Sequence, residues 1–492
     1  MLTPHIGSHA RSGTRSGLVA GCVLVAAAGD LFLLPLMSVR LASPTLLLLA
    51  VLGLFQVRHV LPRLRSEGLA ASLRSAPTAW AFGLFILVML AWVPLAYTRS
   101  PDPTQARAEL TGVITGVLLA AGTAAATRYT AGGLRSMRLG WVIGLVLALG
   151  TAVFEIATGR HVHADESLSW TLDPTIVAGP FRNPNDFAAI LAVLISGTIA
   201  YRAGVRSARA RAGLAVLAAF GVVAVFLTQS RGGLVAIVLV LAIHAVRVLA
   251  DRRDAGRVPT PRSSRGPRTV TWAIAGAALV AVVAAFTVPV LARHNPIVTM
   301  ITAAGQPGTA RSDTLRLDLI RAGWRYFTGS DHLGTGAGSF EYLLAHDPNP
   351  GVSHIIWMHN TFLELLLQYG IVVAAALVAV VVAVLVTSAR SLLHVRGKTA
   401  EQRRETRMMV AEALSALVAF AALGTLAYTA LETHAWWMLL AYAVVAASTL
   451  TARHTRPKIG SDATTSTPPD DGSSEVTTRG MQFVGLVPRS PR

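Results

Sequence analysis

Apolar runs long enough to cross a membrane recur along most of the chain, and short arginine-bearing stretches separate them. A hydrocarbon core of about 30 Å requires roughly 20 apolar helical residues to cross. Composition points the same way, because hydrophobic residues make up 53% of the 492 residues and charged residues only 14%, against about 25% charged in ordinary soluble domains. The sequence therefore predicts an all-α integral membrane protein.

We count about twelve candidate transmembrane helices, and the second is the least secure because it is short and contains Pro44. The first run resembles the apolar part of a signal peptide but continues through residues 31–39, which favours an uncleaved helix. The candidate spans lie at residues 17–38, 41–57, 78–97, 109–127, 139–158, 186–201, 212–228, 232–249, 270–291, 360–387, 409–430 and 435–452.

The basic residues predict how the helices are oriented. Arginine and lysine favour the cytoplasmic side of a membrane, and with the N-terminus inside, most of the 43 Lys and Arg fall in inner loops. The densest groups are residues 247–268 and 390–407. We predict a multi-pass protein of the bacterial cytoplasmic membrane with both termini in the cytoplasm. The net charge of +18 then reflects topology, and no nucleic-acid partner is expected.

These spans divide the chain into five parts. The long loop contains helical patterning at residues 314–326, and loops of this length often carry binding or catalytic groups. The predicted parts are a cytoplasmic tail at 1–16, nine spans within 17–291, a long extracytoplasmic loop with short helices at 292–359, three spans within 360–452, and a disordered cytoplasmic tail at 453–492.

The positive-inside rule disfavours arginine on the outer side of the membrane, so an outer arginine becomes a candidate for ligand binding or catalysis. Arg231 stands in Gln229-Ser230-Arg231-Gly232-Gly233, a tight turn between two predicted spans. Glycines let the backbone approach a ligand, and the forked donors of arginine match phosphate oxygens. The alternative is an arginine at a helix end that contacts lipid headgroups.

Two further outer arginines stand in distinctive contexts. Arg182 lies in Gly179-Pro-Phe-Arg-Asn-Pro-Asn-Asp186, where Asn185 and Asp186 are expected N-caps of the sixth span, and capping alone would explain them. Arg311 is the preferred ligand contact in the long loop, and at helical spacing it shares a face with Arg325. The loop also holds Arg316 and Arg321, and some of these arginines are expected to be ordinary solvated charges.

A histidine and a glycine-rich stretch complete the outer candidates. His359 opens the tenth predicted span in His359-Asn-Thr-Phe-Leu-Glu364, and nearby arginines favour the neutral imidazole that a general base requires. The alternative is a histidine that merely lies at the interface, and His332, His346 and His354 are weaker candidates. Gly334-Thr-Gly-Ala-Gly-Ser-Phe340 lacks dinucleotide-binding spacing and is interpreted as a tight turn packed on the membrane face.

We expect neither a metal nor another cofactor. His161-x-His163 with Asp165 and Glu166 is the one cluster with ligand-like spacing, and it is a poor candidate. Cys22 is the single cysteine, which excludes an internal disulfide or a cysteine-based metal site. The sequence also contains no phosphate-binding loop of the nucleotide-dependent type.

Taken together, these segments resemble the O-antigen ligase/polymerase superfamily of membrane glycosyltransferases. The likeness rests on Gly179–Asp186, Ser230-Arg-Gly-Gly233, Arg311 with Trp324 and Gly334–Phe340, and His359-Asn360 followed by Gly370. It runs from about residue 179 to the end of the tenth span. Arg182 departs from the family pattern, in which a small or neutral residue is more common.

The resemblance implies a reaction and its partners. Members transfer or polymerise glycans from polyprenyl-pyrophosphate donors on the outer face of the membrane, with inversion and without metal. It implies that Arg231 and Arg311 bind the pyrophosphate and that His359 takes the acceptor proton. The acceptor stays open between glycan, lipid and protein, as does the choice between ligase and polymerase. Further candidate substrate contacts are Arg182, Asn185, Ser230, Gly336 and Asn360.

The competing interpretation is a polytopic transporter for a small solute such as bicarbonate. Transporters usually carry ionisable groups near the membrane midplane. Here the candidates are few, namely Asp30, Glu155 and Glu412, and the unusual polar groups gather at the outer surface. That distribution favours glycan transfer over transport.

Overall fold

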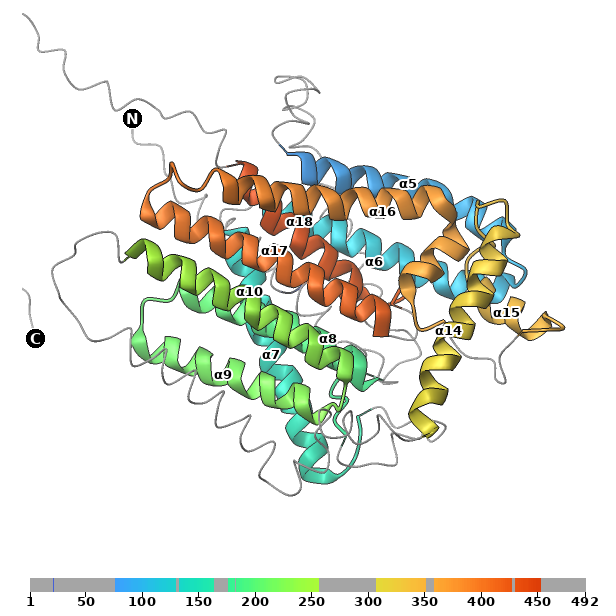
Figure 1. Ribbon diagram of the computed structural model, residues 1–492, viewed down its shortest axis with the longest axis horizontal. Coiled ribbons are helices and arrows are strands. Elements are labelled where there is room, and N and C mark those ends of the chain that lie inside the picture. Colours follow the sequence, from blue (N-terminus) through green and yellow to red (C-terminus); the bar gives the residue numbers. More distant parts are fainter. Residues whose placement is uncertain are drawn as a thin grey trace, which may run out of the picture. The chain divides into compact units, whose positions relative to one another are not determined.

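The computed structural model describes Gly21 and residues 76–129, 132–162, 176–181, 183–255, 307–350, 358–426 and 430–452. Within these ranges every regular element is an α-helix, and no strand occurs (Figure 1). Apart from Gly21, the predicted spans at 17–38, 41–57 and 270–291 lie outside these ranges, as do the tails at 1–16 and 453–492. The helices are α5 (Pro77–Arg99), α6 (Pro103–Tyr129), α7 (Gly133–Thr158), α8 (Pro184–Ala203), α9 (Ala208–Leu227), α10 (Arg231–Ala255), α14 (Pro307–Thr328), α15 (Ser339–His346), α16 (Thr361–Leu393), α17 (Ala400–Leu426) and α18 (His434–Ala452).

Nine of the described helices are long and apolar enough to cross a membrane, namely α5 to α10 and α16 to α18. Each matches one predicted span, so nine of the twelve are confirmed as helices and the total of twelve stays a prediction. The predicted ends are less accurate. The span placed at 409–430 begins at Ala400, because its first turns consist of charged residues that favour helix without being apolar.

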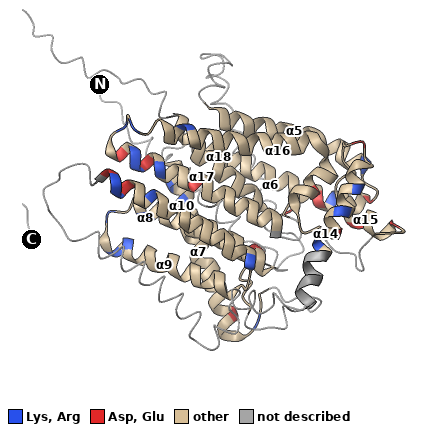
Figure 2. Cartoon of the chain, in the orientation of Figure 1, with Lys and Arg blue, Asp and Glu red and all other residues tan. Residues whose placement is uncertain are grey.

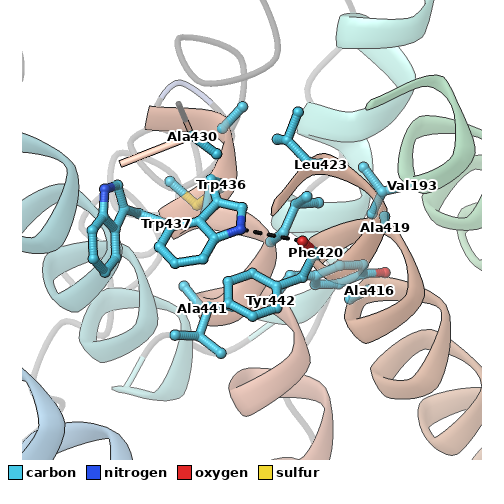
Figure 3. Packing of buried hydrophobic residues seen from close by; sticks show 14 of the residues in the cluster. Val193, Ala416, Ala419, Phe420, Leu423, Ala430, Trp436, Trp437, Ala441 and Tyr442 are labelled. Carbon is cyan, nitrogen blue, oxygen red and sulfur yellow. Dashed lines mark hydrogen bonds between the residues drawn. The ribbon is translucent and has the colours of Figure 1, made fainter. Parts of the chain in front are cut away.

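Helices α8, α17 and α18 form the most buried part of the described bundle, and α5 and α9 are far more exposed. Trp436 and Trp437 lie in the first turn of α18 and are fully buried. Trp436 stacks on Phe420 of α17 with ring centroids 4.5 Å apart, and its indole N–H donates to the Phe420 carbonyl at 3.2 Å (Figure 3). These aromatic side chains bury large areas and satisfy the indole donor that burial would otherwise leave unpaired.

Small residues allow the helices to approach closely. A Cβ at Gly116 of α6 would lie 2.2 Å from the Trp437 ring, and one at Gly197 of α8 would lie 2.6 Å from Trp141. Helix association in a membrane relies on such close van der Waals contact, because lipid tails are as apolar as the helix surfaces. The glycines therefore fix how α6 packs on α18 and how α8 packs on α7.

One charged cluster is buried among the helices. Arg138 of α7 donates to Glu412 of α17 through Nε at 2.7 Å, and the Tyr442 hydroxyl of α18 also donates to this carboxylate. The Glu412 side chain is fully buried, and the Arg138 side chain is 17% exposed. A buried carboxylate requires such partners, so Glu412 joins three helices and has a structural role.

The remaining charged residues gather toward the helix ends, and most of the length between is uncharged (Figure 2). At one end, α10 and α17 are connected by ion pairs from Arg403 to Asp254 at 2.8 Å and from Arg407 to Asp251 at 3.1 Å. This is the end predicted to face the cytoplasm. Helices α14 and α15 lie at the opposite end (Figure 1), where the candidate site residues are found.

Candidate functional site

The glycine-rich loop docks into a break in α16. Gly370 has φ +78° and interrupts the helix, so the Ile371 N–H donates to His332 O at 3.0 Å instead of to its own helix. The freed carbonyls of Leu367 and Gln368 accept from Thr335 N at 2.8 Å and Gly336 N at 3.1 Å. Backbone donors and acceptors are thus paired across the break, as burial requires. Residues 334–338 therefore form the predicted turn, Ser339 and Phe340 already belong to α15, and packing on the membrane face stays a prediction.

Two charged side chains fix this loop from the α5–α6 corner. Arg99, at the end of α5, donates to Gly334 O at 2.7 Å and Ser330 O at 3.1 Å. Glu109 of α6 is buried and accepts from Tyr369 Oη at 2.7 Å and from Gly338 N at 3.0 Å. Sequence reasoning missed Glu109. Its signal is a carboxylate at the start of an otherwise apolar span.

Gly336 is a packing position in this loop. Its φ is +101°, and a Cβ there would lie 2.3 Å from the Ser100 backbone nitrogen. Both the backbone conformation and the space therefore require glycine. The contact with the α5 corner accounts for the residue without a ligand, and its predicted substrate contact stays untested.

Helix α14 lies against the start of α16 and carries the loop arginines. Its inner face buries Leu319, Ala322 and Phe327 against Met358 and Leu363. The predicted helical segment at 314–326 lies within this helix. On its other face Leu317, Ile320 and Trp324 are exposed, with Trp324 at 54%. Their spacing places them on one stripe, so α14 is amphipathic and also presents apolar groups outward.

The arginines of α14 differ in whether they have an acidic partner. Arg321 pairs with Asp318 at 3.0 Å, and Arg325 pairs with Asp347 at 2.9 Å. Half-buried Arg316 forms no hydrogen bond or ion pair within the part of the chain that the structure describes. Arg311 lies in α14, but its side chain is outside the described residues, so its contacts and the face it would share with Arg325 stay predictions. Arg316 thereby becomes a further candidate for ligand binding, beside the predicted Arg311.

The Arg325 pair belongs to a small polar cluster that holds α14 to the segment after α15. The Tyr326 hydroxyl donates to Asp347 at 2.7 Å. Burial, followed by the nearby carboxylate, raises the pKa of Tyr326 to about 12. That hydrogen bond in turn lowers the pKa of Asp347. At neutral pH the tyrosine is therefore the donor and the carboxylate is charged.

In the turn at Arg231, two neighbouring residues have structural roles, whereas the arginine side chain itself has none that the described contacts show. Ser230 Oγ accepts from Gly233 N at 3.0 Å and so caps α10. A Cβ at Gly233 would lie 2.2 Å from Ala188 of α8, which explains that glycine. Arg231 itself is exposed and has no hydrogen bond or ion pair among the described residues. Capping and packing therefore account for Ser230 and Gly233 but not for Arg231, nor for Gln229, which has φ +55° and a buried side-chain nitrogen with no hydrogen-bond partner among the described residues.

The motif before α8 corrects one prediction. The N-cap is Asn183, whose side chain accepts from Asn185 N at 2.8 Å, and the helix begins at Pro184. Asn185 and Asp186 were therefore wrong as N-caps, because the proline occupies the first helical turn and makes the preceding residue the cap. Arg182 lies outside the described residues.

Glu155, near the end of α7, accepts hydrogen bonds from the backbone at the start of the 179–186 motif. Its carboxylate accepts from Ala178 N at 2.9 Å and Gly179 N at 2.8 Å, and it also accepts from Val162 N. His161 Nδ1 lies 3.4 Å from the same side chain. Glu155 was a candidate for transport chemistry, and these contacts assign it to fixing the loop.

His359 lies at the start of α16 in an unusual conformation. Its φ is +53°, which is uncommon for a residue with a side chain and is often found at functional sites. Asn360 is the N-cap, and its Oδ1 accepts from Leu363 N at 3.1 Å. The half-buried imidazole therefore stands just before a capped helix N-terminus, and capping accounts for Asn360.

The structure brings these residues to one end of the bundle. Helix α10, which Arg231 begins, packs on α17, and α17 packs on α16, which follows His359. Helix α14 packs directly on α16. Among the described ranges, no group of three or more His, Cys, Asp or Glu side chains has a metal-binding arrangement. His163, Asp165 and Glu166 lie outside those ranges.

Comparison with known proteins agrees with this arrangement. Residues 213–378 match the family model described as O-antigen ligase. The match extends from α9 past the break in α16, so it includes Arg231, Arg311, the glycine-rich loop and His359. No curated protein matches the chain. The family match gives no support to the transporter alternative. Residues 213–378 are therefore similar to the O-antigen ligase family, and the predicted resemblance to the O-antigen ligase/polymerase superfamily of membrane proteins is confirmed.

Proposed function

We propose that this protein is a metal-independent glycosyltransferase of the cytoplasmic membrane that transfers or polymerises glycans from a polyprenyl-pyrophosphate donor on the outer face. Its acceptor is a second glycan, a lipid or a protein. The observation that carries the proposal is the exposed Arg231 within the segment that matches the O-antigen ligase model, which has no ion pair among the described residues. Capping and packing account for Ser230 and Gly233 beside it.

The pyrophosphate is bound by arginine. Arg231 and Arg311 are the proposed ligands, because a guanidinium presents paired N–H donors to phosphate oxygens and stays charged at any physiological pH. Arg231 also begins α10, where the partial positive charge of a helix N-terminus favours an anion. Arg182 is a possible third contact, and half-buried Arg316 of α14 joins the set.

His359 is the proposed general base. Its imidazole takes the proton from the acceptor hydroxyl as that oxygen attacks the anomeric carbon. The bond from the anomeric carbon to the phosphate oxygen breaks, and polyprenyl pyrophosphate leaves with the electron pair. Attack opposite the leaving group inverts the anomeric centre. The leaving group is already activated, so positioning and charge stabilisation supply most of the rate enhancement.

The polyprenyl chain of the donor also requires a binding surface. The exposed stripe of Leu317, Ile320 and Trp324 on α14 supports contact with the outer membrane interface, where tryptophan is favoured. Arg316 lies on the same helix, directly before Leu317. An amphipathic helix of this kind would keep a membrane-anchored pyrophosphate beside the end of the bundle. Asn185, Ser230, Gly336 and Asn360 are then nearby backbone and polar positions for the glycan, although three of them also have structural tasks.

The test is complementation of a deletion strain with His359→Ala and Arg231→Ala, with surface glycan size and lipid-linked intermediates as readouts. Arg321→Ala is the matched control, because Arg321 is exposed and already paired with Asp318. We expect both site variants to reach normal membrane abundance, lose the glycan product and accumulate the lipid-linked donor. Unchanged glycans at normal abundance, with impaired uptake of a small solute, would refute the proposal in favour of transport.

A further inference from the structure

At the end of the bundle away from the candidate site, a cleft of about 710 Å³ opens between α10, the turn after α16 and the start of α17. Its walls combine apolar and charged side chains. The lining residues are Val246, Leu249, Ala250, Arg253, Asp254, Val395, Arg396, Arg403 and Arg407. Neither the glycan-transfer proposal nor the packing of the bundle requires an opening here.

The charge of this cleft is strongly positive. Four arginines line it and only one carboxylate, Asp254, does so. Arg403 and Arg407 both pair with Asp254, each at 2.8 Å. Arg253 and Arg396 are exposed and form no hydrogen bond or ion pair with any residue that the structure describes. Two guanidinium groups at the cleft therefore lack a counter-charge from the described part of the chain, while two others are held in place by Asp254.

The apolar wall lies on the membrane side of these charges. Val246 is 67% exposed and Leu249 is 53% exposed, one to two turns before Arg253 along the spanning helix α10. A ligand that fills the cleft would meet cationic groups at the end of the helix and apolar side chains toward the membrane interior. A free inorganic anion would use only the first of these surfaces.

We propose that this cleft is a binding site for an anionic phospholipid. The phosphate of the headgroup binds Arg253 and Arg396, with Arg403 and Arg407 adding positive potential, and an acyl chain lies along Val246 and Leu249. Arginine binds phosphate through paired donors. Basic pockets between membrane helices bind acidic headgroups at this interface, and each arginine near a charged surface contributes measurably to binding. The predicted cytoplasmic orientation of this end agrees with such a lipid.

The experiment measures lipid binding by the purified full-length protein in a neutral detergent. Phosphatidylglycerol and phosphatidylcholine are titrated separately, and bound lipid is counted by native mass spectrometry while Tm is followed. The wild type should retain phosphatidylglycerol in preference and show a rise in Tm. R253Q/R396Q should weaken phosphatidylglycerol binding about thirtyfold, which corresponds to two arginine contacts at a charged surface.

A matched control removes the same charge elsewhere at the same end. Arg206 and Arg209 are exposed, lie outside the cleft and have no ion pair among the described residues, so R206Q/R209Q should leave binding unchanged. Equal loss in both double variants would overturn the proposal, because general surface attraction would then explain it. So would equal binding of both lipids, or an equal rise in Tm from inorganic phosphate alone.

Discussion

At the residue scale, the structure distinguishes side chains that hydrogen-bond within the fold from those that remain available to bind a ligand. Ser230, Asn183 and Asn360 are helix caps, and Glu155 and Glu109 hold loops through backbone N–H groups. Sequence alone does not make this separation. A serine, asparagine or glutamate near a helix end has the same residue type whether it binds backbone or substrate, and only the hydrogen-bond partner distinguishes the two.

The neighbours Ser230 and Arg231 allow this distinction to be tested. Ser230→Ala removes the cap of α10 and should lower the free energy of unfolding by about 1 kcal/mol, with glycan transfer retained in the protein that folds. Arg231→Ala should leave Tm nearly unchanged and abolish transfer. Arg231→Lys keeps the charge but loses the forked donors, so we expect it to retain partial activity.

These outcomes are read from Tm in detergent and from glycan product per unit of membrane protein. A large fall in Tm for Arg231→Ala would show that the residue is structural after all. Full activity of Arg231→Ala would remove it from the pyrophosphate site. Loss of transfer in Ser230→Ala at normal Tm would show that this serine contacts the substrate in addition to capping α10.

At the element scale, the nine described spans follow from the sequence because apolar length alone decides which segments cross a membrane. Their ends do not, since helices such as α17 continue into charged turns beyond the apolar run. The N-cap of α8 was predictable in principle. Pro184 favours the first helical turn, which points to Asn183 rather than to Asn185 or Asp186.

The break in α16 could not be predicted from the sequence. Gly370 lies in a long apolar run that reads as one span, and glycine occurs often within membrane helices. Only the docking of the 332–338 loop shows why the helix opens there, because the freed carbonyls are paired by that loop. The requirement comes from two segments distant in sequence.

Gly370→Ala tests this break. The substitution places a Cβ in a left-handed conformation at φ +78° and 2.5 Å from the Leu333 carbonyl carbon. We expect it to lower the free energy of unfolding by about 2–4 kcal/mol and to impair transfer by displacing the 332–338 loop. Gly397→Ala is the control, since nothing lies within 4 Å of a Cβ there. Equal Tm for the two variants would mean that the loop does not depend on the break.

At the scale of the whole molecule, the two ends of the bundle differ in their chemistry. One end carries the ion pairs between α10 and α17 and the arginine-lined cleft. The other carries α14, α15 and two residues of the segment that matches the O-antigen ligase model, Arg231 and His359. Which end faces the cytoplasm is a prediction from the distribution of arginine, and the proposed reaction depends on it because the glycan donor is used on the outer face.

Cysteine labelling tests the orientation directly. Cys22 is the single cysteine, so a Cys22→Ser background accepts one reporter at a time. Ala345 of α15 and Ala208 of α9 are both exposed and lie at opposite ends of the bundle. Ala345→Cys should react with a membrane-impermeant maleimide in intact cells, and Ala208→Cys should react only after lysis. The positive-inside rule gives this direction, because Arg202 at the end of α8, Arg206 in the turn and Arg209 at the start of α9 lie at this end. The reverse labelling pattern would put His359 in the cytoplasm and exclude catalysis on the outer face while leaving the packing of the helices unchanged.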